Sequence, residues 1–246
     1  MKRILLTSVA LGVLAVGTPA MSADLPIKAA PPVAHVYDWS GVYVGGFGGY
    51  AFGNHNLNDA LGPLPTGFST FTANWESHGP LAGGEVGAYW QSGQFVWGVA
   101  GDGAWTNING TDNNTIGQNG LVQIDSNRLK WVASLRAIGG IAVDRLMLFF
   151  TGGWGVGYID HTDINPGVGI DKFTNNRSGL TAGGGLAYAI TDNLIGKVEY
   201  RYYDLGTYNR ANPSNGVLPY SVANTYSTVL LGLDFKFGGG TIVAKY

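Results

Sequence analysis

The sequence predicts an all-β fold, an eight-stranded antiparallel up-and-down transmembrane β-barrel of a bacterial outer membrane. Three observations indicate this fold: long polar spacers alternate with very short joins, the segments between them alternate apolar with polar residues, and a secretion signal comes first. Four long and three short connections require eight strands, and such barrels place the short turns in the periplasm and the long loops outside. The short joins are residues 92–94, 144–145 and 191–193, and the long spacers are 54–78, 109–127, 160–178 and 207–224.

Residues 1–23 have the features of a secretory signal peptide: two basic residues, an apolar stretch over 4–16 and then small residues. The apolar stretch is shorter than the roughly 20 residues that a transmembrane helix needs. Cleavage after Ser22 or after Ala23 fits equally well. Residues 24–38 contain three prolines and no alternation, and we expect them to form an extended periplasmic leader.

The composition excludes several classes of function. Without Lys2 and Arg3 of the signal peptide, 12 basic side chains face 16 acidic ones, a net charge of −4, which disfavours nucleic acid as a partner. Cysteine is absent, so neither a lipid-anchored N-terminus nor disulfide chemistry is expected. The 40 glycines lie largely inside the apolar segments, where they allow the tight curvature of a narrow closed sheet.

The barrel is expected over residues 39–246, with a short C-terminal extension from residue 238. Each predicted strand exceeds the 9 to 11 residues that cross a membrane when tilted. The predicted strands are 39–53, 80–91, 95–108, 129–143, 146–159, 179–190, 194–206 and 225–237.

Charged residues within a strand share one face, because successive side chains point to opposite sides. In the seventh strand Lys197, Glu199 and Arg201 alternate with apolar and aromatic residues. An eight-stranded barrel is just wide enough for its interior side chains, so we expect these charges to pair inside the lumen; a polar conduction path is the alternative. The expected lumen charges are Glu85, Asp102, Glu199, Asp234, Lys130, Arg136, Lys197, Arg201 and Lys236.

A soluble lipocalin-like barrel would show the same alternation with its apolar face inward. Aromatic residues near both strand ends favour the membrane, because the two interfaces select tryptophan and tyrosine. The residues expected near the short turns are Trp90, Phe95, Trp97 and Phe237, and those near the long loops are Trp105, Trp131, Tyr158 and Tyr226.

No catalytic, metal-binding or cofactor-binding residue is predicted. His55, His78 and His161 fall in or beside the outer spacers without a close metal-binding spacing, and we expect them to be solvated loop residues. His161 and Ser178 have no catalytic motif around them, so an enzyme is not expected. The run 109–115 resembles a calcium loop only in composition, which favours a loop tip.

Several segments resemble the outer-membrane immunogenic protein family of alphaproteobacteria, the RopB-type small barrels that are similar in shape to OmpA and OmpX. The resemblance rests on the ADLP leader at 23–26, the run 38–45, and the segments 197–202 and 232–237. It implies an eight-stranded barrel inserted by the outer-membrane assembly machinery, with roles in envelope integrity and surface antigenicity and, in some relatives, haem binding or solute passage. Members of this family often end on the aromatic residue of the last strand, matched here by Phe237, whereas this chain continues to Tyr246.

The sequence thus predicts a non-enzymatic protein of the cell outer membrane that supports envelope integrity and surface interactions. Two alternatives remain open: a small-solute, porin-like pore, and binding of haem or another ligand by the external loops. The expected partners are outer-membrane lipids and lipopolysaccharide, the assembly machinery, and a surface ligand such as haem.

Overall fold

The computed structural model describes residues 35–58, 72–113, 122–167, 169–211, 219–238 and 242–243. The predicted signal peptide, residues 1–23, and residues 24–34 of the predicted leader lie outside the described residues. No helix in the described part of the chain is long and apolar enough to cross a membrane.

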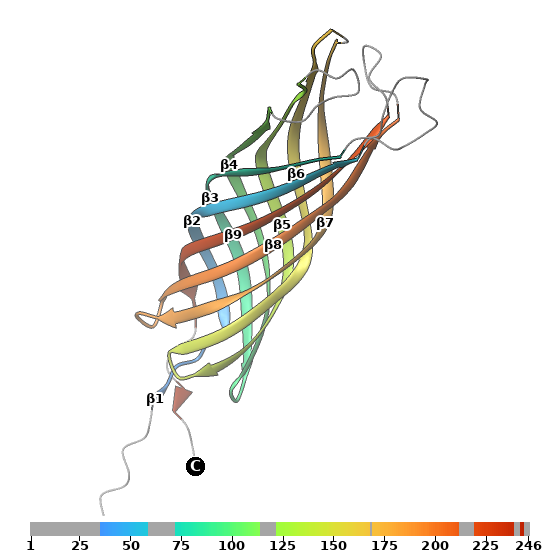
Figure 1. Cartoon of the computed structure of the whole chain (residues 1–246). Helices are drawn as coiled ribbons and strands as arrows, with labels where there is room; N and C mark the ends of the chain where they lie inside the picture. The colour runs from blue at the N-terminus through green and yellow to red at the C-terminus, as the bar shows by residue number, and fades with distance from the viewer. Residues whose placement is uncertain are drawn as a thin grey trace, which may run out of the picture. The chain divides into compact units, whose positions relative to one another are not determined.

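Eight antiparallel strands form a closed barrel in the order β2-β3-β4-β5-β6-β7-β8-β9 (Figure 1). Each strand pairs with its neighbours in the chain, and β2 pairs with β9 to close the ring. The eight-stranded antiparallel prediction is therefore confirmed. The strands are β2 (Gly41–Asn58), β3 (Thr72–Ser92), β4 (Phe95–Asp112), β5 (Ile124–Val143), β6 (Leu146–Asn165), β7 (Gly169–Ala189), β8 (Leu194–Arg210) and β9 (Tyr220–Phe237).

Three short turns lie at one end of the barrel, which we call the turn end; the opposite end is the loop end. The turns join β3 to β4, β5 to β6 and β7 to β8, where the sequence predicts them. Gly93 and Asp144 adopt positive φ angles of 61° and 51° in the first two turns, a conformation that glycine and, less often, aspartate tolerate. Outer-membrane barrels keep short turns in the periplasm, so the loop end is the end that the sequence predicts to face outward.

The strands extend further toward the loop end than the sequence predicts. β3 begins at Thr72 instead of residue 80, and β5 begins at Ile124 instead of 129. The predicted spacer 160–178 is mostly strand, because β6 continues to Asn165 and β7 starts at Gly169. The hydrophobic alternation ends before the strands do, because both faces of these strand ends carry many polar residues. Backbone hydrogen bonds between the strands continue there although neither face is apolar.

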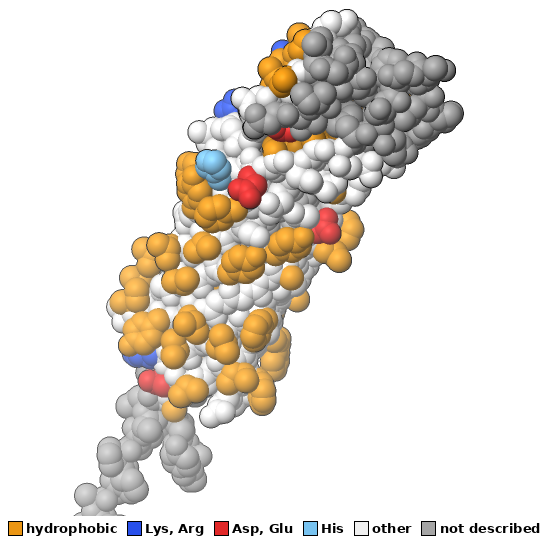
Figure 2. Space-filling model, in the orientation of Figure 1, with side chains coloured by type: hydrophobic (Ala, Val, Ile, Leu, Met, Phe, Trp, Pro, Cys, Tyr) orange, Lys and Arg blue, Asp and Glu red, His pale blue; other side chains and the backbone are white. Residues whose placement is uncertain are grey.

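The outer face near the turn end is apolar, and the outer face near the loop end is polar (Figure 2). Leu135, Phe150 and Leu231 are each about two thirds exposed, at 69%, 65% and 65%. Such a belt needs hydrocarbon around it, because exposed apolar patches of this size are unusual in soluble monomers. We call the belt portions of the strands the membrane-spanning segments; they cover 42–52, 80–90, 95–105, 131–143, 146–158, 180–190, 194–202 and 229–237.

Three β-bulges lie at the loop-end border of this belt. They interrupt the pairing register at Trp105/Ile108 in β4, Leu129/Trp131 in β5 and Asp204/Thr207 in β8. The extra residue of a bulge can reverse which face the following residues of its strand occupy. In β5 the extra residue is Lys130, and both Lys130 and Trp131 are exposed on the outside.

The segments flanking the barrel pair with each other. β1 (His35–Val36) and β10 (Ile242–Val243) form a small antiparallel sheet. Part of the predicted leader and part of the predicted C-terminal extension therefore form secondary structure together. Phe237, expected to match the end of the family's last strand, is the final residue of β9.

Candidate functional site

The lumen is closed at its turn end by aromatic side chains, which we call the aromatic plug. Trp39 is fully buried; its backbone N–H donates to Gln91 Oε1 at 2.7 Å, and its indole Nε1 donates to the Asp144 carbonyl at 3.0 Å. Tyr37 packs edge-on against Trp39, with ring centroids 5.1 Å apart. Tyr43 and Tyr89 stack at 4.6 Å on the inner side. The chain just before β2 thus folds into the mouth of the barrel.

Lys236 completes the plug. Its ammonium lies 4.1 Å from the centre of the Tyr37 ring and donates to the Asp38 carbonyl. A cation over an aromatic face is attracted to the ring electrons, so this contact joins β9 to the segment just before β2.

An ionic layer lies above the plug, inside the membrane-spanning part of the barrel. Arg136 Nη1 donates to Glu199 Oε1 at 2.9 Å, and Arg136 Nε donates to Asp102 Oδ1 at 3.0 Å. Arg201 Nη2 pairs with Glu199 Oε2 at 2.8 Å, and Arg201 Nη1 pairs with Asp102 Oδ2 at 3.1 Å. Two arginines from β5 and β8 therefore share two carboxylates from β4 and β8.

Lys197 extends this layer toward β9 and β3. Its ammonium lies 3.1 Å from Asp234 Oδ2 and also pairs with Glu85. All of these side chains are at most 6% exposed. Paired charges of this kind tolerate burial, whereas an uncompensated charge does not.

The predicted lumen charges are confirmed with one exception. Glu85, Arg136, Glu199, Asp234 and Lys236 are at most 5% exposed, and the Asp102, Lys197 and Arg201 side chains are buried with them. Lys130 was wrongly predicted to face the lumen, because the bulge in β5 turns it outward. It pairs there with Asp160 at 2.6 Å, with 44% of its side chain exposed.

A second apolar layer separates the ionic layer from the loop end. Its members are Phe47, Ala51, Leu81, Ala104, Ile108, Leu129, Val132, Ile159, Tyr203, Leu205, Tyr226 and Leu230. Tyr226 was predicted at the outer aromatic border, yet it is 2% exposed inside the lumen. The other predicted border residues lie outside, and Trp131 stacks on Tyr158 with centroids 6.1 Å apart.

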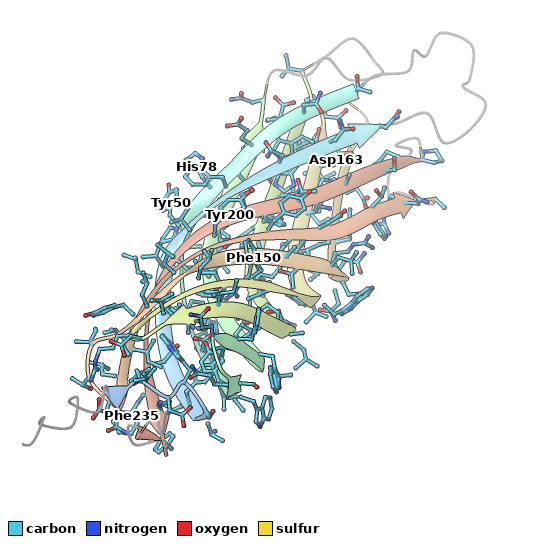
Figure 3. The ribbon with its side chains drawn as sticks, turned by 90° about the horizontal axis from the view of Figure 1, so that it is seen from below. Tyr50, His78, Phe150, Asp163, Tyr200 and Phe235 are labelled. Carbon is cyan, nitrogen blue, oxygen red and sulfur yellow. The ribbon has the colours of Figure 1, made fainter. Side chains whose placement is uncertain are left out.

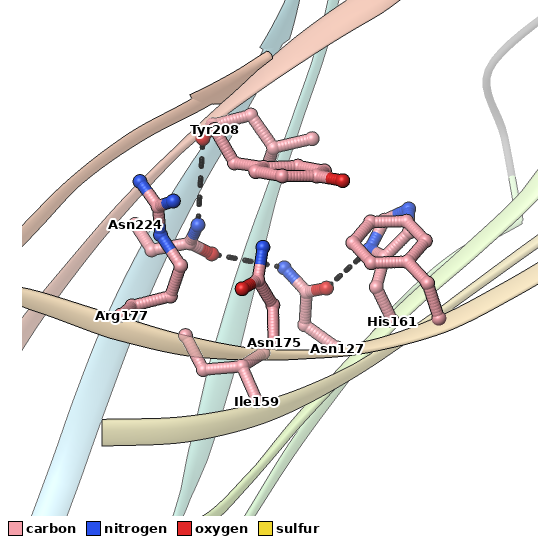
Figure 4. Close-up of a pocket in the computed structure, with 9 residues that line it drawn as sticks. Asn127, Ile159, His161, Asn175, Arg177, Tyr208 and Asn224 are labelled. Atoms are coloured by element: carbon pink, nitrogen blue, oxygen red, sulfur yellow. Dashed lines mark hydrogen bonds between the residues drawn. The ribbon is translucent and has the colours of Figure 1, made fainter. Parts of the chain in front are cut away.

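Two buried histidines lie above this layer, beyond the membrane-spanning segments. His55 Nδ1 lies 2.8 Å from Asn224 Oδ1, and His55 Nε2 lies 2.8 Å from Ser77 Oγ. His161 Nδ1 bonds Asn127 Oδ1, whose amide donates to Asn224 at 3.1 Å (Figure 4). Burial lowers the pKa of both histidines to about 4, so both are neutral near pH 7.

The prediction of solvated loop histidines is therefore wrong for His55 and His161, at 2% and 3% exposure. His78 is exposed as predicted, but it lies on β3 and not in a loop. A cavity of about 20 Å³ adjoins the two asparagines and His161 (Figure 4). It has room for about one water molecule, far less than haem requires. Its lining residues are Asn127, Ile159, His161, Phe173, Asn175, Arg177, Tyr208, Val222 and Asn224.

Four inward-facing aspartates form a row across adjacent strands near the loop end; we call it the aspartate row. Asp112 pairs in register with Asp125, Asp125 with Asp163, and Asp163 with Asp171. Figure 3 shows Asp163 toward the loop end and Phe235 at the opposite end. Arg210 binds Asp171 through two hydrogen bonds of 2.9 and 3.0 Å.

Burial, followed by the neighbouring carboxylates, raises the pKa of Asp125 to about 8 and that of Asp163 to about 7. Within the described residues, no three His, Cys, Asp or Glu side chains are gathered into a preformed metal cage. The run 109–115 was predicted as a loop tip, but its residues up to Asp112 belong to β4.

Comparisons with known proteins agree with this architecture. The family described as outer membrane protein beta-barrel domain matches residues 8–237. The 31 kDa outer-membrane immunogenic protein of Brucella melitensis is 32% identical over 257 residues, covering 96% of this chain and 100% of that protein. The 22 kDa outer membrane protein of Rhizobium leguminosarum bv. viciae is 28% identical, covering 76% and 78%.

Among solved structures, the outer membrane protein OprG from Pseudomonas aeruginosa aligns over 82% of this chain and 99% of its own, with a TM-score of 0.47 and 13% identity. The match to the family extends over almost the whole chain, through the last residue of β9. The protein is thus an outer-membrane protein, and the chain belongs to the outer membrane protein beta-barrel family together with the outer-membrane immunogenic proteins of Brucella.

Proposed function

We propose that this protein is a non-enzymatic, non-conducting barrel that supports the integrity of the outer membrane and presents its loop end as a surface antigen. The observation that carries the proposal is the filled lumen: the aromatic plug, the ionic layer and the second apolar layer follow one another along the axis. A closed barrel also leaves no strand edge unpaired in the hydrocarbon, where an open edge is not tolerated.

The extracellular part of the barrel supports the surface role. The outer faces of β2 and β3 beyond the membrane-spanning segments carry exposed polar residues, namely Asn54, Asn56, Asn58, Thr72, Asn74, Glu76 and His78. These rows project paired strands into the medium. The Brucella relatives are named as immunogenic, which fits a rigid, accessible surface.

The partners proposed for this protein follow from its two surfaces. The apolar belt and its aromatic borders contact outer-membrane lipids and lipopolysaccharide, because such borders suit the membrane interfaces. Insertion into the membrane is the task of the outer-membrane assembly machinery.

The alternatives receive less support from the described residues. A pore needs a water path along the axis, and three layers of packed side chains oppose it. Haem capture through the predicted histidines needs accessible imidazoles, whereas His55 and His161 are buried and hydrogen-bonded and, of the three, His78 alone is exposed.

Planar-bilayer recording of the refolded protein tests the closed lumen. We expect no discrete conductance steps from wild-type protein whose folded state is checked by its heat-modifiable migration on gels. A Trp39→Ala variant should also stay closed, because the ionic layer lies beyond the plug. Reproducible single-channel steps from the folded wild type would contradict the proposal.

A deletion strain tests the envelope role. We expect greater sensitivity to detergent and to large antibiotics, restored by the wild-type gene. Restoration by a Trp39→Ala variant, but not by a variant that fails to fold, would link the phenotype to the intact barrel wall. An unchanged permeability barrier in the deletion strain would contradict a role in integrity.

A further inference from the structure

The aspartate row places carboxyl groups side by side in a buried position. Asp125 and Asp163 are both 0% exposed and occupy directly paired positions on β5 and β6. Like charges directly opposite in a sheet are destabilising. Arg210 compensates Asp171 at one end of the row, but its charge does not neutralise the Asp125–Asp163 pair as well. Burial and the repulsion between neighbouring carboxylates raise the pKa values of Asp125 and Asp163, and a proton on one carboxyl or a cation between β5 and β6 would relieve this repulsion.

Unpartnered oxygen atoms gather at this place. Both carboxylate oxygens of Asp163 and the amide oxygen of Gln123 are buried without a well-formed hydrogen bond, and the nearby Gln123 amide offsets only part of the burial that raises the pKa of Asp163. Gln123 precedes β5, is 2% exposed, and its amide nitrogen lies 3.2 and 3.4 Å from the two oxygens of Asp125. Buried acceptors without donors are costly, so three such oxygens beside a second carboxylate indicate a missing cationic partner.

We propose that Asp125, Asp163 and Gln123 bind a divalent cation of the calcium class between β5 and β6 at the extracellular end of the lumen. Calcium takes oxygen ligands at about 2.3 to 2.6 Å from carboxylates, amide carbonyls and waters. Directly opposed residues have Cβ atoms about 4.5 to 5.5 Å apart, which allows two carboxylates to bridge one ion.

The ligand set differs from a cage of three acidic or histidine side chains. It consists of two carboxylates and one amide, and water supplies the remaining positions, as is common for this ion. His161 Nε2 lies 3.9 Å from Asp125 Oδ1, on the side toward the membrane. A bound ion would tie the ends of β5 and β6 together beyond the bulge in β5, so the site would stiffen the extracellular rim whether or not the lumen conducts.

Terbium luminescence and calcium calorimetry test the site on the full mature chain, refolded from inclusion bodies into detergent without lipopolysaccharide. Terbium is a calcium analogue that accepts energy from nearby aromatic rings, and Tyr220 OH lies 3.3 Å from Asp171 in the same row. We expect saturable terbium luminescence with wild-type protein, displaced by calcium, and a rise in the melting temperature on adding calcium.

The Asp163→Asn variant should weaken calcium binding at least tenfold, and Gln123→Ala should weaken it severalfold. Asp160→Asn is the matched control, because Asp160 lies three residues away on β6 and faces the outside; it should bind within twofold of wild type. Gln123→Ala keeps the test decisive if Asp163→Asn does not fold. Absence of saturable binding at millimolar calcium, or equal affinity in folded Asp163→Asn, Gln123→Ala and Asp160→Asn, would overturn the proposal.

Discussion

Replacing Arg136 by methionine should destabilise the barrel far more than the same replacement of Lys130. Both residues lie on β5, and the sequence predicted both to face the lumen. The Arg136 side chain is 1% exposed and lies 2.9 Å from Glu199, 2.9 Å from Asp102 and 3.4 Å from Glu85. Removing one partner of a buried ion pair leaves an uncompensated charge and costs about 3 to 5 kcal/mol.

Lys130→Met is the matched control on the outer surface. Its ion pair with Asp160 is 44% and 32% exposed, and exposed pairs contribute about 0 to 1 kcal/mol. Equilibrium unfolding by urea in lipid vesicles, followed by tryptophan fluorescence, measures both. Added salt should change the small effect of Lys130→Met and leave that of Arg136→Met nearly unchanged, because buried pairs are poorly screened. Equal losses of stability in the two variants would refute the account of the ionic layer.

Three further predictions concern the loop end, the wall and the lipid face. Burial lowers the pKa of His55 to about 4, below its ordinary value near 6.5. The unfolded chain therefore binds the proton more tightly than the folded chain does. The free energy of unfolding should fall by up to about 3 kcal/mol as the pH drops from 6.5 to 4. His161 acts in the same direction. In a His55→Gln variant, the free energy of unfolding should fall less steeply as the pH is lowered. Gly153→Ala should impair folding, because its Cβ would lie 2.1 Å from the Leu135 carbonyl oxygen, whereas Gly152→Ala meets nothing within 4 Å and should fold normally on heat-modifiability gels. Leu135→Arg should cost about 2 to 4 kcal/mol in vesicle unfolding, because it places a charge on the lipid face; an unchanged free energy would mean that this face is not in hydrocarbon.

The turn end of the barrel could be predicted closely from the sequence. Short joins at 92–94, 144–145 and 191–193 are readable because apolar alternation continues up to each turn. In the strands that carry charges, the inward face near the turns followed from single residues such as Arg136 and Glu199, which must avoid hydrocarbon.

The loop end could not be predicted from hydrophobicity. At the loop end of β5, inward Asp125 and Asn127, with Gln123 just before the strand, alternate with outward residues that include Ser126 and Arg128, so neither face is apolar. In β6 the available signal was the spacing of two, which carries the inward parity of Phe149, Thr151 and Ile159 on to the loop end. The same spacing links His161 with Asp163 in β6, and it would have placed both inside the lumen.

The two remaining errors of orientation, at Lys130 and Tyr226, have different causes. Lys130 shares its parity with Arg136 in the sequence, but one extra residue at the bulge reverses the faces beyond it. Tyr226 was placed at the border from its distance along the strand alone, although its parity matches buried Leu230. A bulge depends on the pairing of two strands, so a single strand's sequence does not reveal it.

The central claim is that lipid surrounds the apolar rows and that packed side chains fill the lumen. The chain has no cysteine, so single cysteines at positions 230 and 231 can carry a bimane label. Leu231 is 65% exposed and Leu230 is 2% exposed. In vesicles, bimane on the Leu231→Cys variant should be quenched by lipids with a spin-labelled acyl chain and not by aqueous iodide. The Leu230→Cys variant should resist labelling in the folded protein. Iodide quenching at 231, or ready aqueous labelling at 230, would contradict the account.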